Sequence, residues 1–314
     1  MDLRSIQYFV RIADLGSLTR AAGHLHVAQP ALSRHIRRLE EELDVELFSR
    51  SPRGVRLTSA GQLLYEHAER ILRDVERTRD EIRALGGSPS GKVVLGVPPT
   101  VCPLLVPRLV GRMRRESPKV DLKIMEGFSV QLQEWLLNDT IDCAVMTDMA
   151  PNRQLSSTKL VDEDIVLATA RGLRKRAPTV TGVELSRTPL IMTDPLRQII
   201  EPILERSGVR LTVAIELNAI ETIRLMVQQR LGATLMPYSV MHADCLSGVV
   251  EARVVIEPRL RRTLVFAFHA TRRQTFALEE LERALRTEMI ELESEGYFTC
   301  LPQLSAPRQA RAGA

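Results

Sequence analysis

Hydroxyl, amide and guanidinium groups gather on one face of a short segment near the N-terminus. Between Pro30 and about Leu43 the apolar residues recur at helical spacing, and they are Leu32, Ile36, Leu39 and Leu43. The opposite face of such a helix carries Arg34 and Arg37, with Ser33 on its flank. Guanidinium and hydroxyl groups bind phosphates and base edges. The pattern therefore predicts a helix that enters a groove of double-stranded DNA with its N-terminal end first.

A second helix and a short turn are expected just before this segment. Ser17 is placed to cap a helix from Leu18 to about Leu25, and the turn follows at His26 to Gln29. Pro30 suits a first helical position because its φ is fixed. Two helices joined in this way form a helix-turn-helix. From spacing alone, an ordinary solvated helical pair explains the charges equally well.

The residues that follow favour the DNA-binding interpretation. Val45 to Phe48 and Val55 to Thr58 are expected to form two short strands around a basic loop with Pro and Gly at its turn. A basic hairpin in this position is typical of a wing. The run AQPALSRHIRRLEEELDVELFSRSPRGVRLTSAG resembles the N-terminal signature of LysR-type transcriptional regulators.

Seven residues are then expected to contact DNA. Those that should meet base edges in the major groove are Gln29, Pro30, Ser33 and Arg34. Those that should bind the backbone, or the minor groove in the wing, are Arg37, Arg50 and Arg53.

The sequence departs from the family pattern at two positions in this region. Ala28 replaces the serine that usually caps the recognition helix, which should cost about 1 kcal/mol. Gly23 lies inside the preceding helix and should cost about 1 kcal/mol relative to alanine. Neither change removes a DNA-facing group, so we expect a less stable domain rather than a loss of function.

A long helix is expected to begin at Ser59 and to end before a linker of Gly, Ser and Pro at 86–91. Its apolar positions alternate at spacings of four and three, and they are Leu64, Ala68, Ile71, Val75, Thr78, Ile82 and Leu85. This pattern predicts a coiled-coil seam between two copies of the chain. The alternative is a single helix that packs on its own domain. We assign residues 1–58 to the winged helix-turn-helix and 59–87 to the dimerisation helix.

From Lys92 onward, predicted strands alternate with predicted helices. This alternation indicates an α/β domain with a doubly wound parallel sheet in two lobes. The expected strands are 92–97, 120–125, 141–146, 165–169, 190–192, 213–217, 233–236 and 263–268. The expected helices are 101–116, 130–138, 196–207, 220–230 and 275–293. The tail 301–314 is rich in Pro, Ala, Arg and Gln and is expected to be disordered.

Ligands of such folds bind at the carboxyl ends of strands and against helix N-termini. Four turns satisfy this rule and supply the candidate effector-binding residues Pro99, Thr100, Val101, Phe128, Ser129, Asn218, Ala219, Ile220 and Pro237. Taken singly, Thr100, Ser129 and Asn218 are more simply explained as helix caps. Taken together, caps that converge on one cleft favour a site for a small anion or polar metabolite.

The segments GVPPTV, EGFSVQLQEWL and IDCAV also resemble LysR-type regulators, most closely the nitrogen-assimilation-control branch. The resemblance implies a two-lobed effector domain like periplasmic solute-binding proteins over 92–300. Lobe I would comprise about 92–161 and 268–298, and lobe II about 162–267. It further implies a small-molecule effector in place of a cofactor, a cytoplasmic protein, dimers that assemble into tetramers, and contact with RNA polymerase.

Composition bounds the remaining alternatives. The formal net charge of +4 is too small to indicate nucleic-acid binding by itself. An enzyme is disfavoured because nucleophile-elbow, Walker and metalloprotease motifs are missing from the sequence. The missing signal peptide and membrane-length apolar run argue against a secreted solute receptor or a membrane protein. A redox-sensing regulator and a ligand-independent regulator of the same family stay open. For Cys102, near the expected cleft, a buried apolar role is the simpler interpretation.

Overall fold

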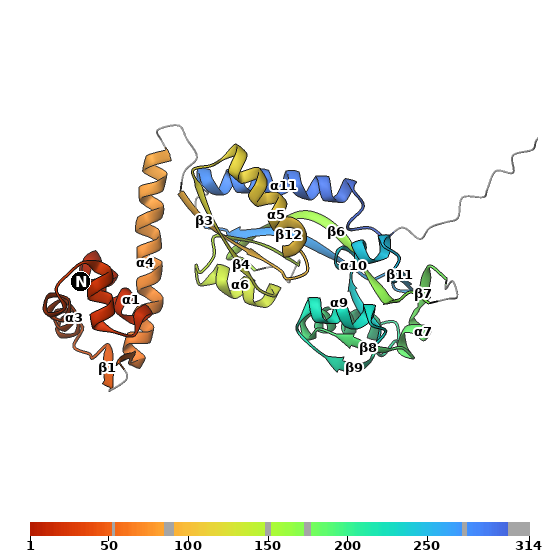
Figure 1. Cartoon of the computed structure of the whole chain (residues 1–314), viewed down its shortest axis with the longest axis horizontal. Helices are drawn as coiled ribbons and strands as arrows, with labels where there is room; N and C mark the ends of the chain where they lie inside the picture. The colour runs from red at the N-terminus through yellow and green to blue at the C-terminus, as the bar shows by residue number, and fades with distance from the viewer. Residues whose placement is uncertain (52–53, 85–90, 148–151, 173–176, 272–274, 301–314) are drawn as a thin grey trace, which may run out of the picture. The chain divides into compact units, whose positions relative to one another are not determined.

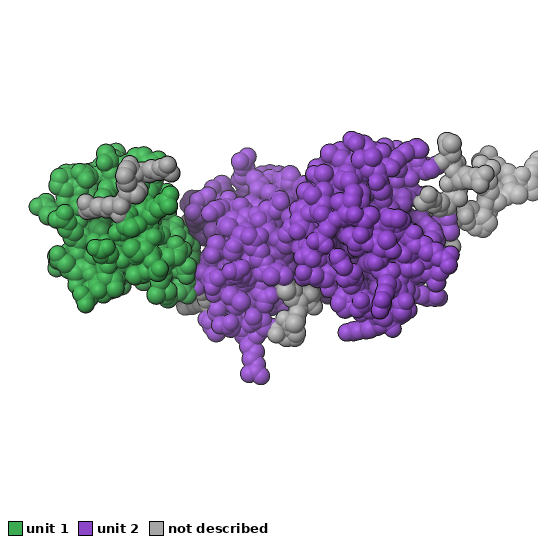
Figure 2. Space-filling model, turned by 90° about the horizontal axis from the view of Figure 1, so that it is seen from below, with its two compact units in different colours: residues 1–91 green, residues 92–314 purple. Residues whose placement is uncertain are grey.

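The computed structural model describes residues 1–51, 54–84, 91–147, 152–172, 177–271 and 275–300. The chain divides into two compact units, residues 1–91 and 92–314 (Figures 1 and 2). Each unit has its own hydrophobic core. Within the described ranges, every helix is too short or too polar to span a membrane.

The first unit is a winged helix-turn-helix followed by a long helix, as predicted. Its elements are α1 (Leu3–Leu15), α2 (Leu18–Leu25), α3 (Gln29–Leu43), β1 (Phe48–Ser51), β2 (Gly54–Leu57) and α4 (Ser59–Ala84). Strands β1 and β2 pair antiparallel, with Phe48 opposite Leu57. The first wing strand begins later than expected, because Asp44 ends α3 in a left-handed conformation (φ 55°) and the chain must turn before it can pair.

The core of this unit fixes the orientation of α3. Leu32, Ile36 and Leu39 are buried against Phe9 and Ile12 of α1. Burying a side chain of this size contributes roughly 1.5–3 kcal/mol. Three members of the stripe predicted from helical spacing are therefore buried, whereas the fourth, Leu43 at the end of α3, is 38% exposed.

Helix α4 uses part of its apolar stripe inside its own domain. Ala68 is fully buried, and Leu64 and Ile71 pack against the same core. Farther along, Thr78 is exposed and Ile82 has 64% of its surface exposed. The single-domain alternative thus describes the first half of the stripe, and only the second half remains for a partner. Leu85 lies outside the described residues.

The second unit is built on one sheet that runs through both lobes (Figure 1). Lobe I contains β3 (Gly91–Val97), α5 (Cys102–Glu116), β4 (Val120–Glu126), α6 (Ser129–Leu137), β5 (Cys143–Thr147) and α11 (Phe276–Ser294). Alternate residues of β3 face opposite layers, because Leu95 packs under α5 and α11 whereas Val94 packs under α6.

Lobe II is inserted between the strands β6 (Leu155–Ala170) and β12 (Arg261–His269). Strand β6 pairs with strands of both lobes, whereas β12 pairs with β5 and with the first part of β6. It contains β7 (Thr179–Thr181), α7 (Gly182–Ser186), β8 (Pro189–Met192), α8 (Asp194–Glu205), β9 (Thr212–Glu216), α9 (Ile220–Gln228), β10 (Thr234–Pro237), α10 (Tyr238–Leu246) and β11 (Val250–Ile256). Strand β6 pairs with β12 as far as Asp164 and with β10 from Ile165 onward. The crossover between the lobes therefore lies at Asp164 and Ile165.

The expectation of a purely parallel sheet is wrong. Strands β3 and β5 are parallel, but β12 runs antiparallel to both β5 and β6. The cause is topological, because the chain must leave lobe I along β6 and return along β12 beside it. Strand β11 was not predicted, since Arg253 interrupts its apolar pattern. In the structure Arg253 is buried and its charge is paired with Glu184.

The N-terminus of α3 offers a direct test of local stability. Ala28 is the N-cap residue, it has extended backbone angles (φ −67°, ψ 132°), and it makes no side-chain capping bond. We predict that Ala28→Ser stabilises the first unit by about 1 kcal/mol, because the new hydroxyl can accept a backbone N–H of the first turn. Denaturant unfolding of the full chain measures the change. Ala31→Ser is the control, since residue 31 is already helical and cannot cap. Equal shifts in both variants would contradict this assignment.

Candidate DNA-binding surface and ligand cleft

The outward face of α3 carries the predicted DNA-contacting groups. Gln29, Pro30, Arg34 and Arg37 are exposed, and Ser33 is half-buried. The structure therefore brings these five residues together on one face, at the N-terminal half of the helix. This face can approach a groove without any rearrangement of the core behind it.

The arginines on this face are not neutralised by acids. Arg34, Arg37 and Arg38 have no hydrogen-bond or ion-pair partner among the described residues. Many arginines of the second unit are paired with carboxylates, and they include Arg108, Arg112, Arg197, Arg224, Arg253, Arg259 and Arg262. Unpaired exposed guanidinium groups are available to phosphates and guanine edges.

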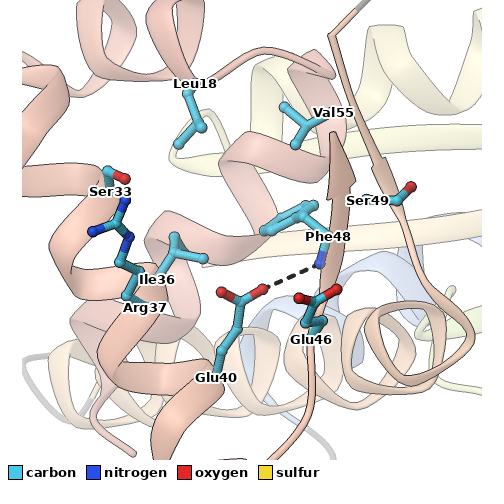
Figure 3. A pocket seen from close by; sticks show the side chains of 9 residues that line it. All are labelled: Leu18, Ser33, Ile36, Arg37, Glu40, Glu46, Phe48, Ser49 and Val55. Atoms are coloured by element: carbon cyan, nitrogen blue, oxygen red, sulfur yellow. Dashed lines mark hydrogen bonds between the residues drawn. The ribbon is translucent and has the colours of Figure 1, made fainter. Parts of the chain in front are cut away.

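The wing lies beside α3 across a groove with a volume of about 560 Å³ (Figure 3). Of the two predicted wing contacts, Arg53 lies outside the described residues, and only the backbone of Arg50 is described, in β1. Arg56 on β2 is exposed and was not predicted from the sequence. The sequence showed that the wing is basic. It did not show the strand register, which decides that Arg56 is exposed.

A second hollow, with a volume of about 300 Å³, lies between the two lobes of the second unit. Five of the predicted effector-binding residues line it, namely Thr100, Phe128, Ser129, Ile220 and Pro237. The structure thus brings five of the nine residues chosen by the strand-end rule together in one hollow, and their role in effector binding stays a prediction. Lobe II contributes mainly apolar groups, among them Leu196, Ile199 and Met236.

The remaining predicted residues do not line this cleft. Val101 is fully buried in the core of lobe I. Asn218 uses its side-chain oxygen to accept the backbone N–H of Asp194 at 2.9 Å, so it positions the start of α8. Pro99 and Ala219 are also outside the lining. Asn218 therefore does not cap its own helix α9 either, since the N-cap of α9 is Ala219 and makes no side-chain capping bond.

Hydroxyl groups on the cleft wall favour a ligand that carries a hydrogen-bond acceptor. Ser129 Oγ accepts the backbone N–H of Thr147 at 3.1 Å, and Thr193 Oγ1 accepts that of Leu196 at 3.3 Å. Because both oxygens serve as acceptors, their hydrogens remain available to donate. Helix α6 begins beside them with neither a side-chain cap nor an acid in its first turn. Such a helix start favours a negative or strongly polar group.

Arg262 is the charged residue of the cleft lining, and no motif or spacing in the sequence pointed to it. It donates to Thr100 Oγ1 at 2.9 Å and pairs with Glu163 at 2.7 Å. Glu163 is fully buried and also accepts the backbone N–H of Ser239 at the start of α10. One chain of hydrogen bonds behind the cleft thus joins lobe I, the strands β12 and β6, and lobe II.

Three of the four cysteines have a thiol whose pKa is raised. Burial raises the pKa of the Cys102 thiol to about 11, and a hydrogen bond with Glu126 acts in the same direction. Burial likewise raises the pKa of Cys245 to about 12 and that of Cys300 to about 11. Reactive cysteines need the opposite shift, because the thiolate is the nucleophile. In the described part of the chain, no group of three or more His, Cys, Asp and Glu side chains could hold a metal ion.

These pKa shifts predict slow thiol chemistry. A raised pKa keeps each thiol protonated at neutral pH, so alkylation of Cys102 by iodoacetamide should keep rising beyond about pH 10. An unperturbed thiol of pKa about 8.5 should level off at about pH 10. Peptide mass spectrometry at a series of pH values measures this. We also expect hydrogen peroxide at neutral pH to leave DNA affinity unchanged within twofold. A large, reductant-reversible change in affinity would instead support the redox alternative.

Comparison with known families accounts for both units. Residues 3–62 match the bacterial regulatory helix-turn-helix proteins of the lysR family. Residues 86–290 match the LysR substrate binding domain. These two matches together cover the DNA-binding surface, α3 included, and the cleft between the lobes.

Individual relatives agree with these matches. The chain is 33% identical over 249 residues to the nitrogen assimilation regulatory protein nac of Klebsiella aerogenes, covering 78% of this chain and 81% of that protein. It is 29% identical over 302 residues to the DNA-binding transcriptional dual regulator OxyR of Escherichia coli, covering 95% and 97%. The solved structure of a full-length OxyR variant from Pseudomonas aeruginosa superposes with a TM-score of 0.67 at 26% identity, covering 92% and 94%.

Proposed function

The chain belongs to the LysR family of transcriptional regulators, and we propose that α3 reads its operator while the cleft of the second unit binds the effector. In this assignment, Gln29, Pro30, Ser33 and Arg34 contact base edges in the major groove. Arg37 binds phosphate, and Arg50 and Arg53 do so from the wing.

The assignment of α3 to DNA reading rests on one observation, that Arg34 and Arg37 form no ion pair with a described acid. Arg34 and Arg37 project from a helix whose opposite face is locked into a core, and no acid among the described residues neutralises them. A rigid helix with unpaired cations loses little conformational entropy when it binds DNA. Exposed arginines without a printed acid partner also occur in the second unit, for example Arg187 and Arg206, so what distinguishes Arg34 and Arg37 is their place on one face of a helix whose other face is buried.

Arg34→Ala tests base reading. We expect it to weaken operator binding by about 1–3 kcal/mol and to reduce the preference for operator over scrambled duplex, since a bidentate base contact is lost. Fluorescence anisotropy with both duplexes at matched salt measures the two affinities. Arg187→Ala, which removes an exposed arginine of the second unit, is the control. Equal losses on operator and scrambled DNA would refute base reading by Arg34.

We propose that the effector is a small amphipathic molecule with one hydrogen-bond-accepting head, such as a carboxylate. The hydroxyls of Thr100 and Ser129 and the uncapped start of α6 support a head on the lobe I side. The apolar wall of lobe II, with Ile199 and Met236, supports an apolar body. A volume of about 300 Å³ suits one small molecule. Binding of such a molecule to both lobes favours the closed cleft.

A graded set of monocarboxylates, from acetate to phenylacetate, with the matching primary amides, tests this class of effector. We expect carboxylates that carry a ring, such as phenylacetate, to raise the melting temperature of the full chain. Thr100→Ala should weaken their binding about tenfold, which corresponds to the loss of one charge-assisted hydrogen bond. Thr271→Val is the control, because Thr271 is exposed and outside the cleft lining. Stabilisation that is the same in Thr100→Ala would place the ligand elsewhere, and no stabilisation by any compound would favour a ligand-independent regulator.

We further propose that two copies pair through the exposed second half of α4, where Val75, Thr78 and Ile82 continue the heptad spacing. Pairing would bring two recognition helices to half-sites that are a whole number of helical turns apart. Assembly of dimers into tetramers, contact with RNA polymerase and a cytoplasmic location complete the proposal, and family membership supports them.

A further inference from the structure

The recognition helix and the wing are separated along most of their length. The groove between them has a volume of about 560 Å³, with Ser33 and Arg37 on the helix side and Ser49 on the wing side (Figure 3). Its lining also includes Phe48 and Val55. Packing holds the base of the wing, because Leu47 and Phe48 are buried in the same core as Ile36 and Leu39 of α3. Beyond that base the groove is open, so hydrogen bonds between the two elements can help to fix the angle between them.

Glu40 spans this groove at one end. It lies on α3, one turn beyond Ile36, and its Oε1 accepts the backbone N–H of Leu47 at 2.8 Å. The same oxygen accepts the backbone N–H of Phe48 at 3.3 Å, the bond drawn in Figure 3. Among the described residues, no other α3 side chain is hydrogen bonded to the wing. Both amides stand where the chain enters β1, so Glu40 fixes the first strand of the wing to the recognition helix.

The other ends of the wing are attached to different elements. The hydroxyl of Thr58, at the start of α4, donates to the carbonyl of Glu46 at 2.7 Å. The backbone N–H of Val55 donates to the carbonyl of Gly16 in the α1–α2 turn at 3.1 Å. These bonds hold the wing to the body of the domain, and among the described residues Glu40 supplies the side-chain hydrogen bonds between the wing and the helix that carries Arg34 and Arg37.

We propose that Glu40 is a positioning residue that holds the wing at a fixed angle to the recognition helix, so that both contact DNA in one register. The proposal rests on the function proposed above, in which α3 and the wing bind the same duplex. Glu40 itself need not touch DNA. It acts through two backbone amides, and each charge-assisted hydrogen bond is stronger than its neutral counterpart.

The direction in which DNA affinity changes when Glu40 is removed distinguishes a positioning role from simple charge repulsion. Removing an acid from a DNA-binding domain reduces repulsion of phosphates and should tighten binding. Removing Glu40 should weaken DNA binding instead, because the wing then loses its fixed angle to α3. The wing must be ordered before it can contact DNA, and this ordering costs binding free energy. Glu41 is the matched residue, since it is a neighbouring, exposed glutamate of the same helix.

The experiment uses the full chain and an operator selected from a random duplex library by the wild-type protein. Glu40→Ala, Glu40→Gln, Glu41→Ala and Glu41→Gln are compared by hydroxyl-radical footprinting, operator affinity and thermal melting. We expect Glu40→Ala to lose protection at the flank that the wing contacts, to keep protection at the half-site read by α3, and to bind about tenfold more weakly, as the loss of one to two such bonds predicts. Glu40→Gln keeps an acceptor oxygen and should fall between Glu40→Ala and wild type.

The outcomes are distinguishable. The Glu41 variants should keep the complete footprint and bind at least as tightly as wild type. The proposal is overturned if the Glu40 variants behave like the Glu41 variants. It is also overturned if flank and half-site protection decline together in both Glu40 variants in proportion to unfolded protein, because Glu40 would then serve stability alone. Failure of the underlying function would be visible separately, since the wild-type protein would select no operator.

Discussion

The structure of the first unit depends on how α3 divides its surface. Leu32, Ile36 and Leu39 are buried against α1, and this burial alone fixes which residues face outward. Arg34 and Arg37 are then exposed without an acid to neutralise them among the described residues. A helix whose back is fixed can present its front as a rigid surface, and rigidity limits the entropy lost on binding. The capping of α1 and α2, the wing and the start of α4 all serve to keep that helix in place.

The second unit depends on two consecutive acids of β6. Glu163 and Asp164 are both fully buried, and neighbouring strand residues point to opposite faces. Glu163 joins Arg262 and the start of α10 behind the cleft. Asp164 pairs with Arg259 and accepts the backbone N–H of Cys300, so it ties the segment after α11 to the crossover. Removing one partner of a buried ion pair typically costs about 3–5 kcal/mol. The crossover between the lobes is therefore held on both faces by buried carboxylates, of which Glu163 pairs with buried Arg262 and Asp164 with half-exposed Arg259.

Much of this could be predicted from the sequence, and the failures have physical causes. Helical periodicity placed α3 and its buried stripe, and the strand-end rule placed Thr100, Phe128 and Ser129 in one cleft. Both signals are local. Arg262 could not be found in this way, because its position depends on the register of β12 against β6 across the lobe crossover. The parallel sheet was mispredicted for the same reason. Spacing also could not divide the apolar stripe of α4, because it does not tell an intramolecular face, such as that of Ala68, from an intermolecular one.

Base reading by α3 in the major groove is the central claim, and methylation interference tests it most directly. Full-length protein is bound to its selected operator after sparse dimethyl sulfate treatment, and the bound and free fractions are cleaved at modified purines. The account predicts interference by guanine N7 methylation, a major-groove position, in two clusters a multiple of about 10 base pairs apart. Interference confined to adenine N3 in the minor groove, or none at either position, would contradict it.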